Sequence, residues 1–168
     1  IYRKTYSAMV ANLDDNIGRV LDELEKNKTI DNTLIWFISD NGGYSITHKA
    51  HASNGILKGE KHSLNEGGIR VPSVLSWPAQ FKSGQVLSQA ICNVDVMPTL
   101  ANMLGFENQI NKENQDGIVL TNILKTGKKR SRDIYWKYQN GKQRAFRRGD
   151  WKLYGDELYD LKTDPSEK

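Results

Sequence analysis

The segment LIWFISDNGG, residues 34–43, joins an unbroken apolar run to an acid, an amide and two glycines. Residues 33–38 predict a strand that is apolar on both faces, which is typical of strands inside a parallel sheet covered by helices. Asp40 and Asn41 then follow the carboxyl end of this strand, where open α/β sheets bind ligands. Their oxygens suit a hard cation such as Ca²⁺ or Mg²⁺, although a plain Asx turn explains the same two residues.

The segments around this strand predict an α/β core. Upstream, apolar residues at steps of three and four indicate an amphipathic helix over residues 3–27. Downstream, we expect strands at residues 71–77 and 88–94, and then a helix that Asp95 caps and Gly105 ends. The predicted core covers residues 1–114 and holds part of a mixed, mostly parallel sheet flanked by helices.

The pattern changes after residue 115. Short aromatic-rich segments alternate with Gly and Asp turns, and YQNGKQ and RRGDWK carry the turn residues of hairpins. We therefore predict a small antiparallel subdomain over residues 115–168. Its aromatic and arginine side chains either pack this sheet against the core, which we favour, or line a sugar site. These side chains are Trp136, Arg144, Arg147, Arg148 and Trp151.

Composition excludes several classes of function. The 168 residues carry a net charge of +4, and no stretch reaches the length of a membrane span. A basic run over residues 125–132 lacks interleaved aromatic residues, which predicts a solvated loop and no nucleic-acid partner. The single cysteine, Cys92, is expected to be a small core residue. Both ends of the sequence are expected to be cuts in a longer chain, because Ile1 leads straight into a helical pattern.

The stretch GILKGEKHSLNEGGIRVP, residues 55–72, gathers cations among glycines close to Asp40 and Asn41. Its spacing does not match a phosphate-binding P-loop. Cations in a Gly-rich loop can hold an anionic group, but Lys58, like any single one of them, is more typical of a solvated side chain. Arg70 is expected to form an ion pair with Glu66.

His48 and His51 form an H-x-x-H pair. No third ligand follows at a spacing typical of zinc sites, so we predict no zinc site there. Asp14 and Asp15 lie on or beside the polar face of the first predicted helix, and we assign them no catalytic role.

Five segments resemble, in order, the second half of a type I sulfatase, a formylglycine-dependent enzyme of the alkaline phosphatase superfamily. They are TLIWFISDNGG, LKGEKHSLNEGGIRVP, DVMPTLANMLG, RRGDWKLY and ELYDLKTDP. The resemblance implies that Asp40 and Asn41 bind Ca²⁺ and that Lys61 contacts the substrate sulfate, with His62 beside it as a second candidate for substrate contact. It also implies a formylglycine nucleophile, made from Cys or Ser in a C/S-x-P-x-R motif, whose hydrate attacks sulfur.

The sequence departs from this family in one respect: it has no C/S-x-P-x-R, and Cys92 lies in CNVDV. None of its histidines matches the family's catalytic histidine. We therefore expect a fragment that lacks the nucleophile and is inactive alone, from a protein that hydrolyses a small-molecule or carbohydrate sulfate ester. The resemblance implies a periplasmic, secreted or lysosomal location.

Two alternatives stay open. One is a phosphodiesterase or phosphonate hydrolase of the same superfamily, although those usually place Asp-His after this strand because they hold transition metals through imidazole. Asn41 instead favours Ca²⁺ and a sulfate ester. The other is a non-catalytic sulfatase-like binding module.

Overall fold

The computed structural model describes residues 2–44, 52–111, 113 and 115–168. Helix α1 (Tyr2–Lys26) confirms the predicted amphipathic helix. A short 3₁₀ turn, η1 (Ile30–Asn32), then leads into the first strand. Several large apolar side chains of α1 remain exposed in the described structure, namely Tyr6, Met9, Val10, Leu13 and Val20.

The quoted apolar run forms β1 (Ile35–Ile38), which pairs with β2 (Ser73–Ser76). The mixed α/β class is confirmed, but the expectation of a mostly parallel sheet is wrong for these strands, because β1 and β2 run antiparallel. Phe37 is also exposed, whereas Trp36 and Ile38 are half-buried. The apolar run thus predicted the strand, but neither its burial on both faces nor the direction of its neighbour.

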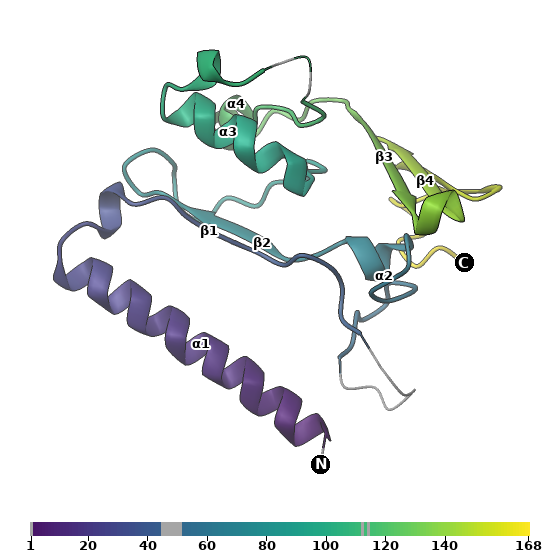
Figure 1. Ribbon diagram of the computed structural model, residues 1–168, viewed down its shortest axis with the longest axis horizontal. Coiled ribbons are helices and arrows are strands. Elements are labelled where there is room, and N and C mark those ends of the chain that lie inside the picture. The colour runs from purple at the N-terminus through teal and green to yellow at the C-terminus, as the bar shows by residue number, and fades with distance from the viewer. Residues whose placement is uncertain (1, 45–51, 112, 114) are drawn as a thin grey trace.

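A helical layer lies on the opposite side of β1 and β2 from α1 (Figure 1). It contains α3 (Val96–Met103) and α4 (Thr121–Thr126), with the 3₁₀ turn η3 (Glu107–Gln109) between them. Gly105 follows α3 in a left-handed conformation with φ of 76°, as its predicted role at the helix end requires. Among the residues described, no helix has the length and apolar character needed to cross a membrane.

The predicted strand at residues 88–94 is wrong, because the chain there ends in a 3₁₀ turn, η2 (Asn93–Asp95). The Asp95 carboxylate causes this turn by accepting the Cys92 N–H at 2.7 Å. Asp95 is fully buried, and it also accepts the Ile118 N–H at 2.8 Å and pairs with Arg132. Arg132 is therefore an exception to the expected solvated basic run, since its side chain is only 7% exposed. Cys92 is half-buried and free.

The C-terminal segments form a four-stranded antiparallel sheet in the order β3-β4-β5-β6, which confirms the predicted hairpins. Its strands are β3 (Asp133–Tyr138), β4 (Gln143–Arg148), β5 (Trp151–Tyr154) and β6 (Glu157–Asp160). The register pairs Tyr138 with Gln143 and Arg147 with Lys152. Because side chains alternate along each strand, these four residues share one face of the sheet.

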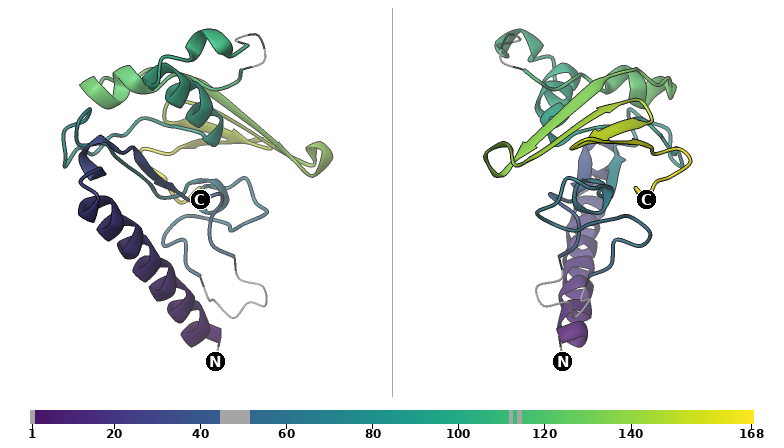
Figure 2. Two further views of the ribbon diagram at one scale, coloured as in Figure 1. Left: turned by 60° about the vertical axis from the view of Figure 1, so that its left-hand side comes forward. Right: turned by 90° about the vertical axis from the view of Figure 1, so that its right-hand side faces the viewer.

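The chain's C-terminal end lies beside α2 (Glu66–Ile69), a short helix in the long connection between β1 and β2 (Figure 2). The Glu66 N–H donates to Glu167 Oε2 at 2.6 Å. The tail after the C-terminal sheet is thus joined to the segment that follows β1. The packing role that we favoured for five side chains of this sheet is not supported for Arg144, Arg148 and Trp151, which are exposed, whereas Trp136 and Arg147 are half-buried. The domain boundary at residue 115 stays a prediction.

Asp95→Ala should lower the free energy of unfolding of the full-length protein by about 3–5 kcal/mol, because it leaves the buried Arg132 without its counter-charge. Urea denaturation measures the change. The matched control is Asp133→Ala, which breaks the exposed pair with Arg148 and should cost much less. Equal losses for the two variants would contradict a structural role for the Asp95 pair.

Candidate functional site

Asp40 and Asn41 form a compact turn directly after β1. Asp40 Oδ1 accepts the Asn41 N–H at 2.9 Å, and Asn41 Nδ2 donates to the Gly42 carbonyl at 2.9 Å. Asp40 Oδ2 and Asn41 Oδ1 have no hydrogen-bond partner among the described residues. This bonding is not the expected Asx turn, because Asp40 accepts the N–H of the next residue and the Gly42 N–H donates to Gly68. One oxygen of each side chain remains available for a cation.

Two glycines bring the chain after β1 against another backbone segment. The Gly42 N–H donates to the Gly68 carbonyl at 2.9 Å, and a Cβ on Gly42 would lie 1.8 Å from the Gly67 carbonyl oxygen. Gly43 accepts the Lys61 N–H at 3.1 Å. Only a glycine at position 42 lets the chain after β1 approach the backbone of α2 this closely. We call residues 54–65, which end at α2, the cradle loop.

The four predicted site residues line one cleft of about 1210 Å³, namely Asp40, Asn41, Lys61 and His62. Trp136, Tyr138 and Arg147 of the C-terminal sheet line the same cleft. The structure thus brings together the side chains singled out from two separate stretches of sequence. The C-terminal sheet lines the cleft as well. The sequence analysis singled out Trp136 and Arg147 of this sheet without assigning them to the site.

Lys61 is half-buried and its backbone is fixed, but its ammonium is free. Its Nζ makes no hydrogen bond or ion pair within the part of the chain that the structure describes. An unpaired ammonium in a cleft that also presents carboxylate and amide oxygens can hold an anionic group beside a bound cation.

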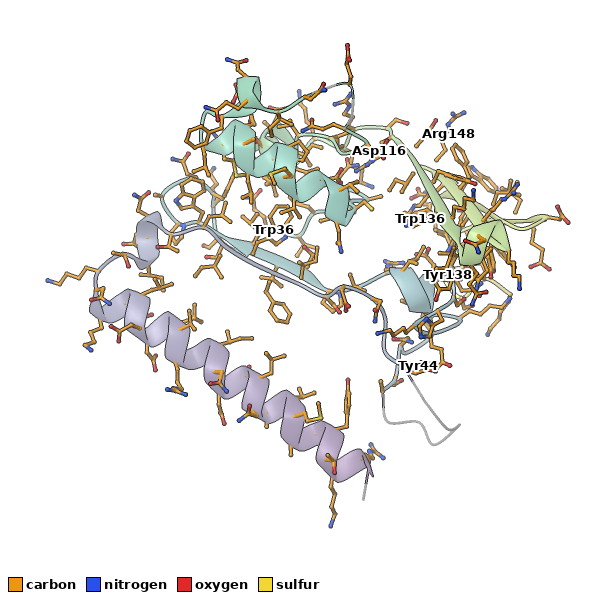
Figure 3. All side chains as sticks on the ribbon, viewed as in Figure 1. Trp36, Tyr44, Asp116, Trp136, Tyr138 and Arg148 are labelled. Carbon is orange, nitrogen blue, oxygen red and sulfur yellow. The ribbon has the colours of Figure 1, made fainter. Side chains whose placement is uncertain are left out.

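His62 adopts a left-handed backbone conformation, with φ of 79°. This conformation is costly for residues with a Cβ, so surrounding contacts must hold it. The His62 Nδ1 lies 2.7 Å from the Tyr138 hydroxyl, its carbonyl accepts the Gln143 amide at 2.9 Å, and the Tyr44 ring packs edge-on at 5.2 Å. Trp136, Tyr138 and Tyr44 lie on the right-hand side of the view in Figure 3. Sequence reasoning missed Gln143 and Tyr138, whose partners lie far away in the chain.

Lys58 is exposed, as the sequence predicted, but its ammonium also has partners within the chain. Its Nζ donates to the Glu167 carbonyl at 2.9 Å and lies 5.7 Å from the centre of the Tyr159 ring. The hydrogen bond that Tyr159 donates to Glu157, together with burial, raises the pKa of Tyr159 to about 12. Tyr159 therefore stays neutral beneath the ammonium, and Lys58 is directed to the C-terminal end of the chain.

The expected ion pair between Arg70 and Glu66 is present, with Nη1 and Oε2 3.8 Å apart. The sequence did not predict that Glu66 also contacts Lys152, whose Nζ lies 2.9 Å from Glu66 Oε1. Lys152 in turn lies 2.8 Å from Glu167 Oε1. The sequence marked Glu66 only as a partner for Arg70, and nothing local to WKLY marks Lys152.

No cluster of three or more His, Cys, Asp or Glu residues that could hold a metal occurs among the described residues. Within the described part of the chain, Asp40 and Asn41 are therefore not part of a larger group of such side chains. His48 and His51, the pair rejected as a zinc site, lie outside the described residues.

Comparison with known families matches nearly the whole chain. A sulfatase family model matches residues 2–106, and a model of the C-terminal part of N-sulphoglucosamine sulphohydrolase matches residues 59–168.

Individual proteins match in the same way. Human steryl-sulfatase is 37% identical over 105 residues, which cover 60% of this chain and 18% of that protein. Pig N-acetylgalactosamine-6-sulfatase is 30% identical over 153 residues, which cover 90% of this chain and 29% of that protein. The crystal structure of PsFucS1 sulfatase from Pseudoalteromonas sp. superimposes with a TM-score of 0.82 at 25% identity, covering 93% of this chain and 36% of the other. The chain thus spans about a fifth to a third of the length of these curated relatives.

Gly42→Ala should destabilise the full-length protein by about 1–3 kcal/mol or more, because the new methyl group would collide with the Gly67 carbonyl. Gly18→Ala in α1 is the matched control, since no atom lies within 4 Å of the added carbon. That change should stabilise the protein by up to about 1 kcal/mol through helix propensity. Denaturant midpoints for the two variants should therefore move in opposite directions, and a harmless Gly42→Ala would refute the close backbone contact.

Proposed function

Because the chain belongs to the sulfatase family, we propose that the full-length protein to which it contributes hydrolyses sulfate esters. One observation carries the proposal: Lys61, whose ammonium has no partner among the described residues, lines the same cleft as Asp40 and Asn41. A sulfate ester presents sulfuryl oxygens whose charge redistributes as the S–O bond breaks. A preorganised ammonium stabilises that charge without reorganising at the moment of reaction.

The donor atoms of Asp40 and Asn41 fit Ca²⁺. Both are hard oxygen ligands, and an asparagine rather than a histidine at position 41 disfavours a transition metal. Ca²⁺ takes about six to eight oxygens, so Asp40 and Asn41 would hold it together with further ligands. When bound, the ion acts as a Lewis acid that polarises the sulfuryl oxygens.

Lys61 and His62 then have separate roles. Lys61 holds a sulfuryl oxygen, and its main-chain hydrogen bond to Gly43 fixes the start of its side chain. His62 directs Nδ1 to Tyr138, which leaves Nε2 for a polar group of the substrate. The nucleophile is supplied from outside this chain, and we propose formylglycine in that role from the family resemblance.

The substrate is a small-molecule or carbohydrate sulfate ester. The names of the relatives cover both kinds, because steryl-sulfatase and N-acetylgalactosamine-6-sulfatase both match this chain. Assays with a generic aryl sulfate and with a sulfated N-acetylhexosamine therefore test the proposal over its full range, and bis(4-nitrophenyl) phosphate, a phosphodiester, tests the phosphodiesterase alternative.

Lys61→Ala in the full-length protein should lower kcat/KM for 4-nitrophenyl sulfate by about 10²–10³, or roughly 3–4 kcal/mol, because one preorganised contact to the sulfuryl group is lost. Lys58→Ala should retain far more of the rate and should instead lower the melting temperature, since its ammonium binds Glu167. Near-wild-type rates for both variants would remove Lys61 from the site.

Asp40→Ala and Asn41→Ala should each weaken Ca²⁺ binding by the full-length protein, because each removes one oxygen ligand. Isothermal titration calorimetry measures the affinity, and the rise in melting temperature on adding Ca²⁺ gives a second readout that needs no turnover. Asp14→Ala, an exposed acid on α1, is the control and should bind Ca²⁺ normally. Unchanged affinity in the Asp40 and Asn41 variants would disprove the cation site.

A further inference from the structure

We propose that Lys152, a buried residue of β5, positions Lys61 by fixing α2 through Glu66. This inference rests on the proposed function, because it assigns Lys61 the contact with the sulfuryl group. It concerns a lysine that lies outside the predicted site and that touches neither the candidate cation ligands nor any candidate substrate contact.

Lys152 has a surrounding that is unusual for a lysine. Its side chain is 0% exposed, and its Nζ lies between Glu66 Oε1 at 2.9 Å and Glu167 Oε1 at 2.8 Å. The two glutamates are equally buried, at 1% and 0%. Three buried charged groups contribute little net stability compared with apolar residues of the same volume. What such a cluster does provide is a defined geometry, because each group has few alternative partners.

Glu66 is held from two directions. Lys152 contacts its carboxylate, while Glu167 Oε2 accepts its backbone N–H at 2.6 Å. Glu66 opens α2, and the next residue, Gly67, donates its N–H to the Lys58 carbonyl at 2.7 Å. Residues 58–67 of the cradle loop and α2 therefore form a closed turn, with Lys61 between the two residues that close it.

The cations near α2 differ in whether a carboxylate lies close enough to pair with them. Arg147 and Arg70 each place Nη1 3.8 Å from Glu66 Oε2, and they are 20% and 55% exposed. Both contacts are to the second oxygen of the Glu66 carboxylate, which has no hydrogen-bond partner among the described residues. Each arginine therefore has a carboxylate within ion-pair distance, whereas Lys61 has none among the described residues and is available for an anion in the cleft.

A double-mutant cycle distinguishes positioning from general stabilisation. Lys152→Met in the full-length protein should lower kcat/KM for 4-nitrophenyl sulfate by about 10-fold to 100-fold, as expected when a reacting group is displaced by about an ångström. In a Lys61→Ala background the same change should lower kcat/KM by less than about 3-fold, because the group that it positions is already absent. Lys142→Met, an exposed turn residue, is the control and should change neither value.

Glu167→Gln provides a milder second variant should Lys152→Met fail to fold. It keeps the shape of the side chain and weakens only the charged contacts with Lys152 and Glu66. The same dependence on Lys61 is expected, together with faster amide hydrogen exchange in the cradle loop.

The outcomes separate the two proposals. A normal sulfate-ester rate for Lys61→Ala alone would overturn the role of Lys61 in the proposed function. A strong Lys61→Ala effect, combined with equal factors for Lys152→Met or Glu167→Gln in both backgrounds, would overturn the positioning role and leave the proposed function standing.

Discussion

The close approach of two backbones at Gly42 is the constraint on which the rest of the cleft depends. The carbonyl of Gly67 occupies the space that a side chain at position 42 would need, and the Gly42 N–H is bonded to Gly68. This contact fixes the end of β1 against α2. Asp40 and Asn41 precede it and Lys61 lies in the loop that α2 closes, so a single backbone contact brings together groups that lie about twenty residues apart in the sequence.

Local patterns predicted the parts of the fold that depend on neighbours in sequence. The helical spacing of α1 and the Gly and Asp turns between β3, β4, β5 and β6 are of this kind. Two features were not predictable in this way: the direction of β2 against β1, and the turn η2 in place of the expected strand at residues 88–94. The first depends on the path of the long connection, and the second on Asp95, whose partners Ile118 and Arg132 come much later in the chain.

Strand β5 shows why the candidate site was only partly predictable. Alternation in WKLY separates Trp151 from Lys152, and hydrophobicity alone would bury the tryptophan. The structure does the reverse, with Trp151 exposed and Lys152 fully buried, because Glu66 and Glu167 supply the counter-charges from distant parts of the chain. The family resemblance supplied Asp40, Asn41 and Lys61 as candidates, yet it could not supply the contacts that hold them, since these depend on side chains that no motif marks.

The joint between the C-terminal sheet and residues 62–66 has a consequence for its response to heat. It includes polar contacts: Gln143 binds the His62 carbonyl and the Leu64 N–H, and Lys152 binds Glu66. The desolvation penalty of charged groups falls as temperature rises, because their hydration carries a strongly negative entropy, whereas hydrophobic stabilisation levels off. The buried ion pair between Lys152 and Glu66 therefore gains in relative weight on heating, and this wall of the cleft depends on it most at high temperature.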